Sequence, residues 1–168
     1  LSALSHELLT DRTSKDYPDV ITFAYFCRRA NLEKEKLKYS DCTQSRIGRG
    51  VTFHIAPSNV PINFAYSMVA ALLSGNACII RTSTKLFPQI EIICNAMKKM
   101  FETCEFDNLR EHIAIIRHER DSDVTSFFSS LCNVRIIWGG DDTINEIRKS
   151  PLPPRAIELL LRIVIHYV

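Results

Sequence analysis

The sequence predicts an α/β protein with a Rossmann-like, mainly parallel sheet and helices on both faces of that sheet. Short apolar segments alternate with longer segments of helical periodicity, which is typical of βαβ units. The composition is 46% hydrophobic and 24% charged, as in globular proteins, and it excludes a disordered or collagen-like chain. With 168 residues, the chain can bury the core of roughly one domain.

The first predicted element is a helix over residues 17–39. Pro18 suits its first turn, and apolar residues recur at helical spacing through its first half. The charged run 33–36 indicates a solvated end. Residues 1–45 are therefore expected to form an N-terminal helical segment.

Residues 46–158 are predicted to form the α/β domain itself. Ser74-Gly75 after an apolar stretch marks the end of a helix, and Pro88 marks the start of another. Parallel strands of this kind are joined by right-handed crossovers. The expected strands are 46–56, 76–81, 113–117 and 134–138, and the expected helices are 62–73, 88–104, 121–131 and 141–149.

The charge balance argues against nucleic acid or an anionic membrane as a partner. The 21 basic and 19 acidic residues leave a formal net charge of only +2. The longest stretch without a charge, 51–80, contains prolines, asparagines and a histidine, so it does not predict a membrane span. No signal peptide is predicted either.

The six cysteines are scattered, without the short paired spacings of a zinc site. We therefore predict no metal site. Cys78 and Cys94 lie within apolar runs, which indicates buried, reduced thiols in a cytoplasmic protein.

Three loops follow predicted strands, and open α/β sheets bind their ligands at that edge. A helix start after Gly139-Gly140 offers free backbone amides to a phosphate. Arg81 and the hydroxyls and cation of residues 83–85 suit a ribose or a ribose phosphate. The loops, 57–61, 82–85 and 139–142, thus have contents that suit a nucleotide.

Each loop also has an ordinary interpretation. A Gly-Gly pair is often a tight turn, and an asparagine between prolines is usually an Asx turn. The spacing alone leaves a nucleotide site and plain connecting loops equally open. We interpret Gly48-Arg49-Gly50 as a turn, His54 as a core histidine, and Trp138 as a packing residue near the ligand.

An ordered set of motifs narrows this choice. The segment 48–85 reads Gly-x-Gly, then His54-Ile-Ala-Pro-Ser-Asn-Val-Pro61, then Ser74-Gly-Asn-Ala77, then Arg81-Thr-Ser-Thr-Lys85; Ile137-Trp-Gly-Gly140 and Pro151-Leu-Pro-Pro-Arg155 follow. This pattern resembles the aldehyde dehydrogenase superfamily, and within it the acyl-CoA reductase branch typified by LuxC, the fatty acid reductase of bacterial luminescence. The resemblance covers about residues 20–158. It implies the cofactor-binding domain of that superfamily, in incomplete form.

The resemblance implies one catalytic role in this chain. Asn59 matches the family asparagine whose side-chain amide stabilises the oxyanion of the tetrahedral intermediate, a task that needs a neutral, rigidly held donor. Pro57 and Ser58, in the same loop, are expected beside the cofactor.

The resemblance also implies a cofactor. Arg81, Ser83, Thr84 and Lys85 lie on the stretch that binds the adenosine ribose. Family members that prefer NAD often carry a glutamate there, so Thr84 between cations favours NADPH over NADH. Gly139 and Gly140 match the turn whose helix start faces the pyrophosphate.

The implied reaction has two steps. A cysteine takes the acyl group from an acyl-CoA or an acyl-protein thioester, and hydride from NADPH then reduces it to a long-chain fatty aldehyde. An acyl-transferase and an acyl-protein synthetase are the implied partner subunits, and the full-length enzyme is expected to be a homo-oligomer.

The chain departs from the family pattern toward its end. The family's nucleophilic cysteine lies beyond the Gly139-Gly140 turn and none of the six cysteines matches it, so we expect the catalytic domain to be absent and this chain to be inactive alone. Residues 159–168 are an apolar tail unlike the family's continuation. A truncation or frame change is favoured there over a last strand or helix.

Three alternatives stay open. The chain is a stand-alone nucleotide-binding module that senses NADPH, or a non-functional gene remnant, or part of a reductase for another substrate such as a short acyl-CoA or an acyl phosphate. Tight binding by a folded monomer marks the first, and an insoluble product marks the second.

Overall fold

A computed structural model describes residues 1–39, 47–119 and 122–161, which form two compact units. The first unit comprises Leu1–Ile47 and Leu86–Glu111, and the second comprises Gly48–Lys85 and His112–Val168. Leu86–Glu111 thus groups with the N-terminal helices, whereas the sequence predicts these residues to be part of the α/β domain 46–158.

The second unit is built on a five-stranded sheet in the order β3-β2-β1-β4-β5. All four strand pairings are parallel, which confirms the predicted Rossmann-like α/β architecture. The strands are β1 (Val51–Ile55), β2 (Ala77–Arg81), β3 (Ile113–Ile116), β4 (Val134–Trp138) and β5 (Ile157–Leu161).

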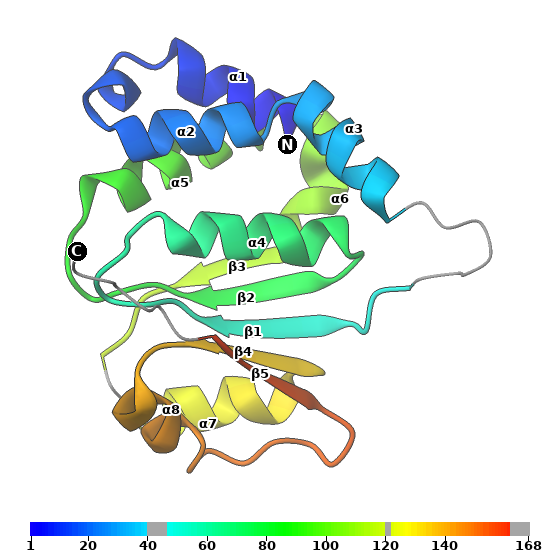
Figure 1. Ribbon diagram of the computed structural model, residues 1–168, viewed down its shortest axis with the longest axis vertical. Helices are drawn as coiled ribbons and strands as arrows, with labels where there is room; N and C mark the ends of the chain where they lie inside the picture. Colours follow the sequence, from blue (N-terminus) through cyan, green and yellow to red (C-terminus); the bar gives the residue numbers. More distant parts are fainter. Residues whose placement is uncertain (40–46, 120–121, 162–168) are drawn as a thin grey trace. The chain divides into compact units, whose positions relative to one another are not determined.

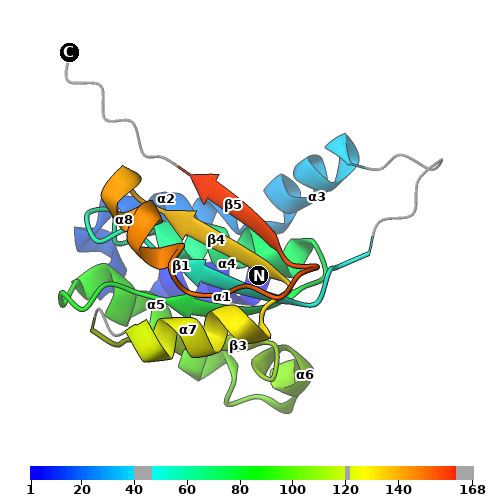
Figure 2. The same cartoon turned by 90° about the horizontal axis from the view of Figure 1, so that it is seen from below.

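Helices cover both faces of this sheet. The helices of the unit are α4 (Asn63–Leu73), α7 (Ser122–Leu131) and α8 (Asp141–Ile147). Figure 1 shows α4 on one face and α7 with α8 on the other, and Figure 2 shows the second face from below. The core on the α7 side contains Phe53, Ile55, Cys132, Ile137 and Ile144.

Strand β4 has the bounds that the sequence predicts, whereas β1 starts later than predicted. The backbone amides of Arg49 and Gly50 donate to Oδ1 of Asn76, at 2.7 and 3.2 Å, and do not enter the ladder. Strand pairing therefore begins at Val51. Asp121, the first residue of the helix predicted over 121–131, lies outside the described residues.

A fifth strand occupies part of the segment that the sequence analysis interprets as a tail. β5 pairs with β4, and its Glu158 accepts hydrogen bonds from the fully buried Arg135, with Nε 2.9 Å from Oε1. Arg148 completes the ion pair, with Nε 3.0 Å from Oε2 of Glu158. The less favoured interpretation, a last strand, therefore holds for residues 159–161 of the predicted tail, while 162–168 lie outside the described residues.

The first unit is helical. α1 packs against α2 and α5, and Ser5 Oγ on α1 donates to the carbonyl of Ala24 at 2.7 Å. Its helices are α1 (Ser2–Thr10), α2 (Pro18–Phe26), α3 (Arg29–Lys38), α5 (Pro88–Met100) and α6 (Asp107–Arg110), with 3-10 turns at Thr13–Asp16 and Cys104–Phe106. α1 lies within the segment 1–45 that the sequence predicts to be helical, although no bounds are predicted for it, and its Leu4 and Leu8 are buried.

The single helix predicted for residues 17–39 is wrong, because the chain breaks between α2 and α3. The side-chain amide of Asn31 donates to the carbonyl of Phe26 at 2.9 Å and so provides a partner for a carbonyl at the end of α2. The Arg28 guanidinium lies 4.1 Å from the centre of the Tyr25 ring. No glycine or proline marks this break in the sequence. As expected, the charged end is solvated, since α3 has no buried residue.

The cysteines divide by burial. Cys27, Cys78 and Cys132 are buried free thiols, and burial raises the pKa of Cys27 and of Cys78 to about 12. Burial is confirmed for Cys78, whereas Cys94, which the sequence also predicts to be buried, is only half-buried, and Cys104 is exposed. Of the helices that the structure describes, none is long and apolar enough to cross a membrane.

Candidate cofactor site

The order of the strands sets the position of the candidate site. The chain builds β1, β2 and β3 toward one side of the sheet and then returns to place β4 on the other side of β1. Between the carboxyl ends of β1 and β4 the connections diverge, and parallel sheets bind ligands in the crevice at such a point. Because all strands run in parallel, the loops after β1, β2 and β4 lie at this one edge, which we call the carboxyl edge.

The loop after β1 brings Asn59 to the carboxyl edge. The Ala56 amide donates to the Arg81 carbonyl at 3.0 Å, so the end of β1 is held beside the end of β2. Pro57 is buried, whereas Ser58 and Asn59 are exposed. Among the described residues, neither of these two exposed side chains has a hydrogen-bond partner, so the Asn59 amide is free to donate.

The loop after β2 presents hydroxyls and cations. Thr82 anchors it to β3, with its amide 3.0 Å from the Ile116 carbonyl. Buried Ser83 accepts from the Lys85 amide at 3.1 Å, which turns the chain and leaves the side chains of Thr84 and Lys85 exposed.

Arg81 ends β2 and is half-buried. Its Nη2 lies 3.4 Å from the carbonyl of His118, on the segment that follows β3. The guanidinium is therefore aimed along the carboxyl edge, and the stretch 81–85 carries two cations and no carboxylate.

The loop after β4 is the Gly139-Gly140 turn. The Gly139 amide donates to the Leu161 carbonyl at 3.1 Å, and Gly140 is the residue that precedes α8. A Cβ at Gly140 would meet nothing within 4 Å, whereas one at Gly139 would press on Thr143 at 3.0 Å. Open space thus lies beside Gly140, next to the end of β4.

Two carboxylates follow this turn. Asp141 and Asp142 are exposed in the first turn of α8, where they favour the helix dipole. Because these carboxylates would repel a phosphate, the binding of a phosphate here would depend on the cations Arg81 and Lys85 at the end of β2 and in the loop that follows it.

A buried polar cluster lies beneath the carboxyl edge, on the α4 side of the sheet. His54 is 1% exposed, with Nδ1 2.6 Å from Ser67 Oγ and Nε2 2.8 Å from Thr52 Oγ1. Trp138 Nε1 donates to the same Ser67 oxygen at 3.3 Å. Burial lowers the pKa of His54 to about 4, so the ring is neutral at pH 7. The interpretation of His54 as a satisfied core histidine is confirmed.

The structure brings the predicted site residues together and separates them from other motif residues. All nine lie at the carboxyl edge: Arg81 is the last residue of β2, and the other eight lie on the three loops, namely Pro57, Ser58, Asn59, Ser83, Thr84, Lys85, Gly139 and Gly140. The Gly-x-Gly and Gly-Asn motifs instead lie at the opposite edge, which we call the amino edge (residues 48–51, 74–77 and 133).

The amino edge is closed by hydrogen bonds among its own residues. Besides the two amides that Asn76 accepts, the Val51 amide donates to Oδ1 of Asn133 at 2.9 Å. Gly48 packs so tightly that a Cβ there would overlap the Gly75 carbonyl, and Gly75 itself has φ +74°. Sequence reasoning missed Asn133, whose only local signal is its place one residue before a predicted strand.

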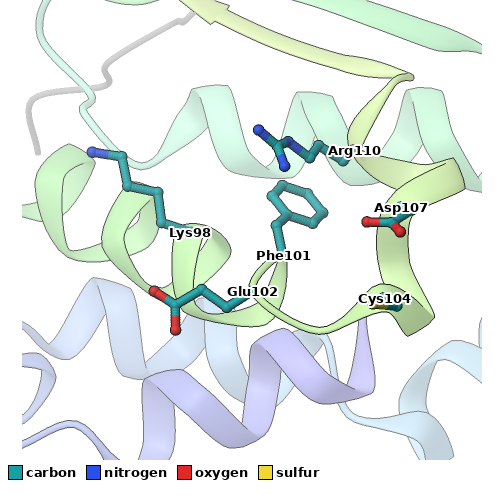
Figure 3. Close-up of a pocket in the computed structure, with 6 residues that line it drawn as sticks. All are labelled: Lys98, Phe101, Glu102, Cys104, Asp107 and Arg110. Atoms are coloured by element: carbon teal, nitrogen blue, oxygen red, sulfur yellow. The ribbon is translucent and has the colours of Figure 1, made fainter.

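A separate hollow in the first unit matches none of the predicted site residues. It measures about 500 Å³ and is lined by Lys98, Phe101, Glu102, Cys104, Asp107 and Arg110 (Figure 3). Five of these six residues are exposed, and the charges are of both signs. Among the described residues, no three of His, Cys, Asp and Glu cluster as metal ligands would.

A known protein family and known structures resemble this chain in sequence and in fold. The family model for acyl-CoA reductase (LuxC) matches residues 26–160, most of the chain. The chain belongs to the LuxC acyl-CoA reductase family. A long-chain acyl-protein thioester reductase of Aliivibrio fischeri is 28% identical over 121 residues, which are 70% of this chain and 24% of the relative. The chain thus spans about a quarter of that LuxC-family relative.

Solved structures show the same fold. A benzaldehyde dehydrogenase from Corynebacterium glutamicum, described as NAD-dependent, matches 94% of this chain and 37% of its own, with a TM-score of 0.59 and 14% identity. The glyceraldehyde-3-phosphate dehydrogenase GapN from Methanocaldococcus jannaschii, complexed with NADP, matches 96% and 37%, with a TM-score of 0.57 and 17% identity. At these identities the likeness establishes the aldehyde dehydrogenase fold for the LuxC-family chain.

Proposed function

We propose that the carboxyl edge binds NADPH and that this LuxC-family chain is the cofactor-binding part of a long-chain acyl thioester reductase. The observation that carries the proposal is the position of the three loops: those after β1 and β4 flank the point where the strand order reverses, and the loop after β2 lies at the same edge of the sheet. The similarity in fold to an NADP-bound and to an NAD-dependent dehydrogenase supports a nicotinamide dinucleotide as the cofactor class, and we infer the preference between the two from the side chains of this chain.

The residues at the carboxyl edge fit the phosphorylated cofactor. Arg81 and Lys85 would bind a 2′-phosphate by charge, and the exposed Thr84 hydroxyl would bind the ribose. The open space beside Gly140 lets backbone amides approach the pyrophosphate closely. When bound, the cofactor supplies hydride to the acyl carbon.

Asn59 is proposed to act on the substrate. Its amide is exposed at the mouth of the reversal point, on a loop fixed at one end by buried Pro57 and at the other by α4. A neutral donor held in this way can stabilise the oxyanion that forms when a thiolate attacks a thioester.

The acyl-transfer step requires a thiolate that we do not find at the carboxyl edge among the described residues. Cys78 and Cys132 lie at the starts of β2 and β4, and burial raises the pKa of each thiol. We therefore propose that this chain alone binds cofactor without reducing a thioester. Aldehyde release from an acyl-CoA by the purified chain would contradict this.

The name of a relative supports the substrate class. The Aliivibrio fischeri protein is named for a long-chain acyl-protein thioester, so we propose that class of substrate. From the family resemblance we also propose acyl-transferase and acyl-protein synthetase subunits as partners, in the cytoplasm. A short acyl-CoA or an acyl phosphate is the alternative substrate. A module that only senses NADPH is the alternative function.

A titration with NADPH and, separately, NADH tests the proposal. Trp138 is the only tryptophan and directly precedes the Gly139-Gly140 turn, so its emission reports on the site. We expect saturable quenching with a higher affinity for NADPH than for NADH. The NADPH affinity should be about tenfold lower in Arg81→Ala, since charge-assisted hydrogen bonds contribute about 1.5–3 kcal/mol. Arg155→Ala is the matched control, because this exposed cation lies in the loop that leads into β5. Equal loss in both variants, or no response to either cofactor, contradicts the assignment.

A further inference from the structure

The buried cluster around His54 forms one continuous chain of hydrogen bonds. It runs from the Trp138 indole through Ser67 and His54 to Thr52, whose Oγ1 lies 2.9 Å from the Ala77 carbonyl. The chain therefore joins four elements: β4, α4, β1 and the start of β2.

The direction of every bond in this chain is determined. The Ala77 carbonyl can only accept, so the Thr52 hydroxyl donates to it and must accept from His54 Nε2–H. His54 Nδ1 is then an acceptor, and the Ser67 hydroxyl donates to it. The Ser67 oxygen in turn accepts from the Trp138 indole, which can only donate. Each hydrogen is used once, and only the neutral His54 tautomer with Nε2–H fits.

This series of hydrogen bonds lies directly beneath the point where the strand order reverses. His54 is three residues before Pro57, and Trp138 directly precedes Gly139. Ser67 is on the helix that leads out of the Asn59 loop. The two loops that flank the candidate crevice are thus linked through three side chains. A satisfied polar network in a core fixes one arrangement, which apolar packing of the same volume does not.

We infer that His54 is a positioning residue for the cofactor site: through Ser67 it holds the Trp138 indole, and with it the Gly139-Gly140 turn, in register with the Asn59 loop. The inference rests on the proposed cofactor site and adds a residue to it that touches neither cofactor nor substrate.

The test uses the purified 168-residue chain and its single tryptophan. Ser67→Ala removes the hydroxyl that joins Trp138 to His54 with little change in volume, and His54→Leu removes the central ring. We expect both to change the near-ultraviolet circular dichroism of Trp138 and to raise its quenching by acrylamide in the absence of cofactor. NADPH affinity should fall about tenfold, because a displacement of about 1 Å in a binding site is costly.

Two further variants separate positioning from general destabilisation. Ile80→Val removes one methylene from the fully buried residue that pairs with His54 across β1 and β2, so it should lower stability and leave the Trp138 signal unchanged. The double variant Ser67→Ala/His54→Leu should weaken NADPH binding no more than the single variant with the larger effect, because both substitutions interrupt the same series of hydrogen bonds.

The outcomes are distinct. An unchanged Trp138 signal in Ser67→Ala overturns the inference, and so does a changed signal with wild-type NADPH affinity. Additive losses in the double variant also overturn it. If the wild-type chain binds no NADPH, the proposed function fails, while the cofactor-free dichroism and quenching still decide whether His54 positions Trp138.

Discussion

At the amino edge of the sheet the motif residues bond to one another, whereas at the carboxyl edge they face solvent. Asn76 and Asn133 accept the amides of residues 49–51, and Gly48 is packed against Gly75. At the other edge Asn59, Thr84 and Gly140 are exposed. Apart from Asn133, both sets belong to the same family motifs, yet only the second has groups left over for a ligand.

One family pattern therefore carries two kinds of constraint. Glycine is required at Gly48 because a backbone carbonyl fills the space of a Cβ, and at Gly75 because φ is +74°. At Gly140 the space for a Cβ is open, so stability does not require glycine there. We therefore expect substitutions at the two edges to affect different measurements.

The largest expected effect is at the amino edge. Gly48→Ala should lower the free energy of unfolding by about 3 kcal/mol, since the new methyl meets backbone that cannot rotate away. The NADPH affinity of the protein that remains folded should not change. Urea unfolding and a fluorescence titration measure the two quantities.

Gly140→Ala is the matched control for that variant. Its free energy of unfolding should change by no more than about 0.5 kcal/mol, while NADPH binding weakens because the methyl enters the open space. Identical behaviour of the two alanine variants would remove the distinction between the edges.

The stability of the protein should depend on the protonation of His54. His54 is buried and neutral, with a pKa of about 4 against 6.5 for the free side chain, so the unfolded state binds more protons between these values. Stability should therefore be full above pH 6.5 and fall by about 3 kcal/mol as the pH drops to 4. Urea unfolding from pH 7.5 to 4.5 measures this fall. In His54→Gln the slope should be shallower, and an equal slope would assign it to other groups.

Cofactor preference should change at the carboxyl edge alone. Thr84→Glu places a carboxylate where the 2′-phosphate is expected, so the NADPH-to-NADH affinity ratio should fall by about tenfold, or about 1.4 kcal/mol. Thr84→Gln has nearly the same shape without the charge and should keep most of the ratio. Calorimetric titration of both cofactors tests this, and an unchanged ratio in Thr84→Glu would place the phosphate elsewhere.

The smallest expected effect is the loss of one amide side chain. Asn76→Ala removes the acceptor for two backbone amides, and because water reaches them the cost should be about 1 kcal/mol. Cofactor affinity should be unaffected.

Asn59→Ala, which removes an exposed amide without a partner among the described residues, should leave thermal unfolding unchanged.

The sequence predicts those parts of the fold whose signals are local. Strand β4 and the Gly139-Gly140 turn follow from an apolar run that ends in two glycines, and the loops after β1 and β2 follow from their prolines and hydroxyls. The parallel sheet follows from the alternation of strands and helices. These local signals are sufficient to bring the nine proposed site residues to one edge.

The features that the sequence does not predict depend on contacts between distant residues. β5 is recognisable only when Glu158 meets Arg135, 23 residues earlier. The break before α3 depends on a side-chain amide that caps α2 and leaves no glycine or proline signal. His54 meets Ser67 and Trp138 only after the sheet and α4 have formed, although its spacing from Thr52 places both on one face of β1.

A residue-resolved NMR titration of the chain with NADPH shows directly which edge of the sheet binds the cofactor. We expect the amide signals of Ser58, Asn59, Thr84, Lys85 and Gly140 to shift with one common affinity. Those of Arg49, Gly50 and Asn76 at the amino edge should stay in place. Shifts concentrated at the amino edge, or no shifts at millimolar NADPH, would contradict the assignment of the carboxyl edge as the cofactor site.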